Sequence, residues 1–76
     1  MPQMTLVTSK MIESVGHEGD TLYVKFGGGA TYKYSPVSGE EYAELLNSDS
    51  VGGYFSRNIK KVKNFEKVEE SGESED

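Results

Sequence analysis

Three consecutive glycines constrain this chain most, because they stand between two stretches in which apolar and polar residues alternate. The apolar members are Leu22, Val24 and Phe26 before Gly27-Gly28-Gly29, and Ala30, Tyr32 and Tyr34 after it. A three-residue loop pairs Phe26 with Ala30, Val24 with Tyr32, and Leu22 with Tyr34, and so puts all six on one face. The pattern therefore predicts an antiparallel hairpin. No Lys-Ser/Thr pair follows the glycines, so we interpret them as a turn and not as a phosphate-binding loop.

A further strand is predicted before this hairpin, from Met11 to His17, joined to it by the turn-forming triplet Glu18-Gly19-Asp20. With that triplet as the loop, Ile12 and Ser14 face the core and Glu13 lies opposite Lys25. The outer face then carries an unusually apolar set, namely Met11, Val15, His17 and Tyr23. Either the N-terminal residues Leu6 and Val7 cover this face, or a partner does.

Two helices are predicted after the strands. Ser38-Gly39-Glu40-Glu41 has the spacing of a capping box, Val37 and Tyr42 stand where a hydrophobic staple would, and Tyr42, Leu45 and Leu46 form a buried stripe. The second helix runs from about Val51 to Lys61 or Val62.

On a helical wheel of the second helix, one arc is apolar and the opposite side is basic. The apolar arc holds Val51, Tyr54, Phe55, Ile59 and Val62, and the basic side holds Arg57, Lys60 and Lys61. Asn58 falls inside the apolar arc. Since a buried amide needs hydrogen-bond partners, Asn58 is expected either to tie a loop backbone or to mark a shallow polar site.

Together these elements predict an α+β domain over residues 8–65, with a three-stranded antiparallel meander followed by two helices that pack on one sheet face. Residues 66–76 carry six acids and one lysine, whereas residues 1–65 carry seven acids and seven bases. An acidic, serine-containing segment with one valine cannot bury enough apolar surface to fold, so we expect a disordered acidic tail beside an electrically balanced domain.

Composition argues against catalysis and metal binding. A chain of 76 residues has a thin core, and it contains no cysteine and one histidine. His17 near Glu18 and Asp20 has no supported triad geometry and is expected to be a surface residue. We therefore expect no enzyme activity, metal or cofactor. The first residues lack a basic region and an apolar run, so we expect no membrane segment and a cytoplasmic protein.

Several of these residues, taken in order, resemble the KTSC domain. The matching stretches are Ser14-Val15-Gly16, Leu22 to Phe26, Tyr32-Lys33-Tyr34, Val37, Tyr42, Leu45-Leu46, Ser50 to Phe55 and Ile59-Lys60. That family is named for the C-terminus of some lysyl-tRNA synthetases and includes small stand-alone bacterial and phage proteins. The resemblance implies RNA binding as a direction for function and assigns no catalytic activity.

The leading functional hypothesis is a non-enzymatic RNA-binding domain. Residues 50–65 contain four cations and no acid, namely Arg57, Lys60, Lys61 and Lys63, and a second surface could use Tyr23, Lys25 and Lys33. We also single out Tyr32, Tyr34, Tyr54 and Asn58 as motif or interaction residues, although Tyr32 and Tyr34 are expected mainly as core. The alternative is a protein-interaction module, either a homodimer or a phage-type protein that binds a host protein with its acidic tail as a charge mimic.

Overall fold

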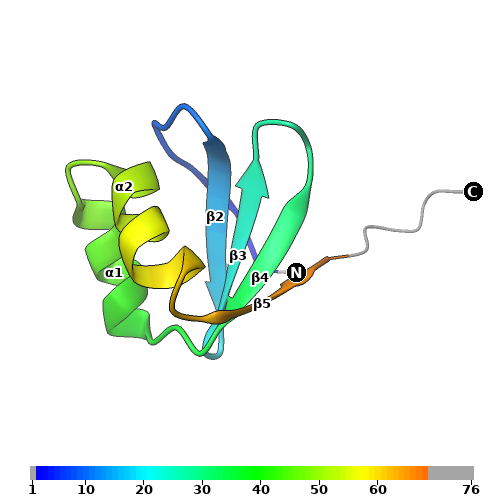
Figure 1. The fold of residues 1–76 in the computed structure, drawn as a ribbon, viewed down its shortest axis with the longest axis vertical. Helices are drawn as coiled ribbons and strands as arrows, with labels where there is room; N and C mark the ends of the chain where they lie inside the picture. Colours follow the sequence, from blue (N-terminus) through cyan, green and yellow to red (C-terminus); the bar gives the residue numbers. More distant parts are fainter. Residues whose placement is uncertain (1, 69–76) are drawn as a thin grey trace, which may run out of the picture.

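A five-stranded antiparallel sheet with two helical segments on one face makes up the fold (Figure 1). The structure is a computed structural model, and it describes residues 2–68. The elements are β1 (Thr5–Leu6), β2 (Ile12–Glu18), β3 (Thr21–Phe26), β4 (Thr31–Ser35), α1 (Gly39–Asn47), α2 (Val51–Phe55), the π-helical η1 (Ser56–Lys60) and β5 (Asn64–Lys67). The strands lie side by side in sequence order.

The α+β class and the two helices on one sheet face are confirmed, but the expected number of strands is wrong. The structure adds β1 to one edge of the meander and β5 to the other. Both strands are short and all of their residues are exposed, so neither has the apolar alternation by which a strand is predicted. Strand β5 includes Glu66 and Lys67, which the sequence assigned to the tail. Val68, also assigned to the tail, donates its amide to the Thr31 carbonyl over 2.8 Å, and residues 69–76 lie outside the described residues.

The register of the β3–β4 hairpin is confirmed. Leu22 pairs with Tyr34 and Val24 with Tyr32, and the Phe26 amide donates to the Ala30 carbonyl over 2.8 Å. Gly29 has a φ of 102°, a left-handed conformation that glycine adopts without steric cost. Local turn chemistry and alternation were sufficient to predict this element.

The predicted register of β2 against β3 is wrong. Glu18 pairs with Thr21, so the loop has two residues instead of three, and Val15 lies opposite Val24 in the core. A register irregularity between Ile12 and Ser14 lets Ile12 face the core as well. Glu13 stays exposed, which is why the burial penalty that argued against this register does not arise.

This register removes two residues from the predicted apolar outer face. Val15 is fully buried, and His17 packs on the helical side, where its ring stacks on Tyr42 of α1 at 5.0 Å between centroids. The N-terminal segment covers part of the outer face: a Cβ built at Gly16 would lie 2.7 Å from the Sδ of Met4 and 3.0 Å from the Gln3 carbonyl oxygen. Glycine at this position therefore permits the close approach of residues 2–4.

Helix α1 begins where the capping box predicts. The Glu41 amide donates to the Ser38 hydroxyl over 3.1 Å, and the Ser38 amide donates to the Glu41 carboxylate over 3.0 Å. Val37 and Leu45 are fully buried. The prediction of Leu46 in the buried stripe is wrong, because this side chain is 38% exposed at the margin of a nine-residue helix.

The second helical segment is confirmed, but its buried stripe differs from the predicted arc. Val51, Phe55 and Ile59 are buried at a spacing of four residues, and the segment changes from α-helical to π-helical at Ser56. The wider winding of η1 alters the wheel positions after Phe55. Asn58 is exposed, so the expectation of a buried amide is wrong. The predicted burial of Val62 is also wrong: the helix ends at Lys60, and Val62 is 66% exposed.

The core lies between the sheet and the helices. It consists of Ile12, Val15, Leu22, Val24, Tyr34, Val37, Leu45, Val51, Phe55 and Ile59. Phe55 sits at its centre, with ring centroids 5.0 Å from Tyr34 and 5.8 Å from Phe26. Within residues 2–68, no helix is both long and apolar enough to cross a membrane.

Candidate nucleic-acid interface

The eight basic residues of the chain fall into two groups according to their ion pairs, and all eight lie within the described residues. Three of them form ion pairs, namely Lys25 with Glu13, Lys33 with Glu66, and Lys63 with Glu41. The other five form none with the residues that the structure describes, namely Lys10, Arg57, Lys60, Lys61 and Lys67. This second group is the one available to an anionic ligand.

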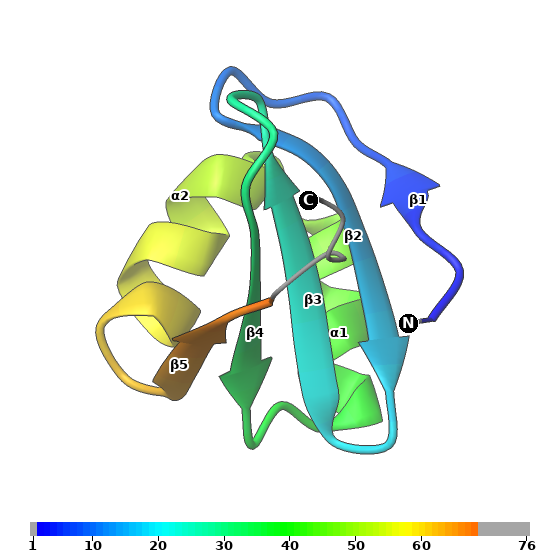
Figure 2. The same ribbon diagram turned by 90° about the vertical axis from the view of Figure 1, so that its right-hand side faces the viewer.

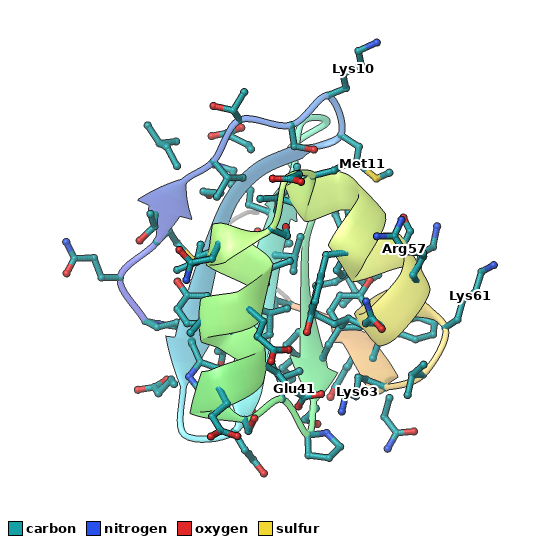
Figure 3. The ribbon with its side chains drawn as sticks, turned by 90° about the vertical axis from the view of Figure 1, so that its left-hand side faces the viewer. Lys10, Met11, Glu41, Arg57, Lys61 and Lys63 are labelled. Atoms are coloured by element: carbon teal, nitrogen blue, oxygen red, sulfur yellow. The ribbon has the colours of Figure 1, made fainter. Side chains whose placement is uncertain are left out.

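Lys63 is part of the fold and not of a free basic surface. Its side chain is 15% exposed, and its Nζ lies 3.0 Å from Oε2 of Glu41. The backbone hydrogen bond from Ser38 and the hydrogen bond from Lys63 hold the pKa of Glu41 below its ordinary value. Lys63 thus ties the chain before β5 to the start of α1, as Figure 3 shows.

The second basic surface predicted from the sequence lies on the outer face of the sheet. Tyr23 pairs with Lys33, and Lys25 pairs with Thr31, so that these side chains point away from the helices. Each lysine has an acidic neighbour, at 3.8 Å for Lys25–Glu13 and 3.7 Å for Lys33–Glu66. A phosphate would have to compete with these carboxylates.

The basic face, which we define as Arg57, Lys60 and Lys61, is exposed on η1 and at its end. Figure 3 shows Arg57 and Lys61 projecting from the same side of the helical segment. None of the three forms an ion pair with a described residue. The structure thus keeps together three of the four cations that the sequence proposed for this surface.

An aromatic groove lies between this helical segment and the sheet. It has a volume of about 340 Å³ and is lined by Phe26, Tyr32, Tyr34, Phe65 and Lys60. The Phe65 ring centroid lies 6.2 Å from that of Tyr32 and 6.0 Å from that of Tyr34, yet the Phe65 side chain is 64% exposed. Figure 2 shows that β5, the strand that contains Phe65, lies along β4 and follows the end of the second helical segment. The groove therefore ends in an exposed ring next to a lysine.

The two tyrosines of the groove occupy different depths. Tyr34 is buried, and burial, together with the neighbouring Tyr32, raises the pKa of its hydroxyl. Tyr32 is half-buried. The expectation that both belong mainly to the core holds for Tyr34, whereas Tyr32 both packs against the core and lines the groove.

Tyr54 and Asn58 make contacts within the helical layer. The Tyr54 hydroxyl donates to Glu44 of α1 over 2.9 Å, and this hydrogen bond, with a smaller effect of burial, raises the pKa of Tyr54. Asn58 donates its side-chain amide to the Tyr54 carbonyl over 3.3 Å, one turn back along the helix. These contacts join α1 to α2 and η1, and neither residue lines the groove.

Sequence reasoning missed three residues of this region. Phe26 was assigned only to the core, Phe65 was given no role, and Lys67 was placed in the tail. Lys67 pairs with Tyr32 and Phe65 with Tyr34, so both lie on the helical face of the sheet. Residues 65–67 are apolar, charged and charged in turn, which does not predict a strand, and only the pairing of β5 with β4 places these side chains.

A larger surface hollow than the aromatic groove lies elsewhere. Its volume is about 640 Å³, and it separates residues 8–11 from the start of α2, with Lys10, Met11, Asp49 and Ser56 among its lining residues. It contains no aromatic ring, and Asp49 faces the same space as Lys10. Its size alone therefore does not make it the better candidate site for a polyanion. Among residues 2–68, no three His, Asp or Glu side chains come together as metal ligands.

Two comparisons with known proteins agree. The model of the KTSC domain family matches residues 8–65 of the chain. The crystal structure of a KTSC domain protein from Yersinia pestis matches with a TM-score of 0.80 and 28% sequence identity, over 88% of this chain and 97% of that one. No protein with a curated description matches the chain.

Proposed function

The chain belongs to the KTSC domain family, and we propose that it is a non-enzymatic RNA-binding domain that uses the basic face of η1. The observation that carries this proposal is that Arg57, Lys60 and Lys61 form no ion pair with any of residues 2–68. Three other lysines do form ion pairs within these residues. Cations without a carboxylate partner can release counterions and bind phosphates at lower cost.

Charge is unevenly distributed, although residues 2–68 are balanced overall. Five acidic residues form no ion pair with a described residue, namely Glu18, Asp20, Glu40, Glu44 and Asp49. They lie at the β2–β3 turn, on α1 and in the loop before α2. The basic face and Lys67 lie instead on η1, at its end and on β5. An uneven distribution of this kind can orient a polyanion toward one side of a neutral domain.

We assign no catalytic step to the domain, because its one histidine is engaged in the fold. His17 donates from Nε2 to the Val37 carbonyl over 2.6 Å and stacks on Tyr42. These two contacts give His17 a structural role, since they hold the segment before α1 against β2.

The test compares two double variants that change the net charge equally. Arg57→Gln/Lys61→Gln removes two unpaired cations, and the matched control Lys25→Gln/Lys33→Gln removes two paired ones. Binding of labelled transfer RNA and of short single strands is measured by fluorescence anisotropy at several salt concentrations. We expect the first variant to lower the slope of log K against log salt by about 0.7 per lost phosphate contact on a single strand, with a smaller change in the control. Equal slopes in both variants would contradict the proposal.

A protein-interaction role is the second candidate, and one observation favours it. Leu6 is 77% exposed and Leu46 is 38% exposed, and both line a cleft of about 490 Å³ between β1, the end of α1 and the start of α2. Exposed apolar side chains that share one cleft are typical of an interaction surface. This surface differs from the outer sheet face on which the sequence-based alternative depended.

Light scattering over a concentration series tests the second candidate. If the cleft mediates homodimerisation, the apparent mass rises with concentration, and the variant Leu6→Lys/Leu46→Lys stays monomeric. A monomer at all concentrations in the wild-type protein would rule out self-association. The acidic charge-mimic hypothesis concerns the tail predicted over residues 66–76, of which residues 69–76 lie outside the described residues.

A further inference from the structure

We propose that the aromatic groove receives one unpaired nucleobase, so that the ligand of this domain is single-stranded. The inference rests on the proposed function and adds the class of RNA that the site takes. It combines three features of the groove: its aromatic lining, the exposed ring of Phe65, and Lys60, which lines the groove.

The rings of the groove leave one aromatic surface without a partner from the described residues. Tyr34 is covered by Phe55 in an edge-to-face contact with an angle of 85°, and Tyr32 contacts the edge of Phe26 at 74°. Phe65 contacts these tyrosines at one side, at 6.0 and 6.2 Å, and is otherwise 64% exposed. A flat apolar ring that stacks on Phe65 would cover surface that the fold leaves in water.

One cation shares the groove lining with this ring, and a second lies on the same face of β5. Lys60 of η1 lines the groove, and Lys67 pairs with Tyr32 on the same face of the sheet. Neither forms an ion pair with a residue in the described part of the chain. The ligand that fits such a site has a flat ring with negative charge beside it, which is the chemistry of a nucleotide. The groove volume, about 340 Å³, lies at the lower end of small-ligand sites, roughly 300–1,000 Å³.

The basic residues beyond the groove favour a polymer over a single small anion. Arg57 and Lys61 extend the unpaired positive charge along the helical segment, and Figure 3 shows both on the same side of it. Consecutive phosphates of one strand can contact these cations while one base enters the groove. In a duplex the bases are stacked inside, so neither the groove nor Phe65 can reach a ring face.

The experiment measures binding of the full chain to a labelled single-stranded 12-nucleotide RNA and to the corresponding duplex, by fluorescence anisotropy. We expect the single strand to bind about tenfold or more tightly than the duplex. Phe65→Leu keeps apolar bulk but removes the aromatic face, and we expect it to lower single-strand affinity about 5- to 100-fold with an unchanged salt slope. Phe65→Tyr should bind like the wild-type protein. The control Val62→Ala, which changes an exposed apolar side chain outside the groove lining, should also bind normally.

Thermal unfolding of each variant shows that it remains folded, and 2-aminopurine placed in the strand reports stacking directly by loss of its fluorescence. Salt-dependent binding that is equal for single strand and duplex, and unchanged in Phe65→Leu, would overturn this inference while leaving the proposed function intact. No binding of the wild-type protein to either RNA would overturn both. Tighter binding of an acidic, tyrosine-containing peptide than of the single strand would instead assign the groove to a protein ligand.

Discussion

The start of α1 differs from the region formed by η1 and β5 in whether its polar and charged side chains have partners within the fold. At the start of α1, Ser38 and Glu41 satisfy each other, Glu41 also accepts from Lys63, and His17 donates to the Val37 carbonyl. On η1 and β5, by contrast, the basic face and Lys67 form no ion pair with a described residue, and Phe65 is exposed.

This difference separates the groups that hold the domain together from those that remain free for a ligand. A domain of this size buries a small core, so the hydrogen bonds at a helix start are a substantial part of its stability. Unpaired cations and an exposed ring add little to stability and cost no native contact when a ligand binds them. The comparison therefore predicts that substitutions in the two regions act on different measurements.

The largest expected effect comes from replacing each of two phenylalanines by alanine, one in the core and one exposed on β5. Phe55 is fully buried, and Phe55→Ala should lower the free energy of unfolding by about 3–5 kcal/mol. Phe65 is 64% exposed, and Phe65→Ala should lower it by less than about 1 kcal/mol. Urea unfolding followed by circular dichroism measures both. If Phe55→Ala does not fold, Phe55→Leu gives the same ranking at a smaller cost. Equal losses at the two positions would show that Phe65 belongs to the core.

A smaller effect is expected at the start of α1. Ser38→Ala removes the hydroxyl that accepts from the Glu41 amide, and should cost about 1 kcal/mol of stability. The control Ser56→Ala, at the start of η1, should change stability by less than about 0.5 kcal/mol. Urea unfolding measures the difference, and RNA affinity at a temperature where both proteins are folded should be the same. A loss of RNA affinity in Ser38→Ala alone would contradict the separation of the two regions.

The smallest effect concerns pH. The folded-state pKa of Glu41 is lowered from its ordinary value of 4.5, first by the backbone of Ser38 and then by Lys63. A lowered pKa means that the contribution of Glu41 is present above the unfolded-state pKa and is lost as the pH falls through the folded-state pKa. The stability difference between the wild-type protein and Glu41→Gln should therefore shrink between pH 6 and pH 3, as measured by unfolding at each pH. A difference that is constant over this range would show that the charge of Glu41 contributes nothing.

Local patterns predicted the elements whose chemistry is complete within a few residues. The β3–β4 hairpin needs only the glycine triplet and its flanking alternation, and α1 needs only Ser38 and Glu41 at their spacing. The basic face was likewise predicted from wheel positions, since Arg57, Lys60 and Lys61 are exposed as expected. In each case the residues that decide the structure are close in sequence.

Contacts between distant residues decided the parts that were predicted wrongly. Val15 is buried because the two-residue loop, in which Glu18 pairs with Thr21, brings it opposite Val24. Lys63 was expected on the free basic surface, yet Glu41, 22 positions earlier, takes it as a partner. Neither contact leaves a local signal, because each depends on how separate elements pack.

By itself the sequence determined a small α+β domain with one glycine-turned hairpin, a capped helix and a basic second helix, since these depend on turn, capping and periodicity rules that act over short distances. Only the tertiary structure decided which cations are free and where the aromatic groove lies. The physical reason is that β5 is too short and exposed to be predicted and gains its hydrogen bonds from β4. This pairing places Phe65 in the groove that Lys60 lines, with Lys67 on the same face of the sheet.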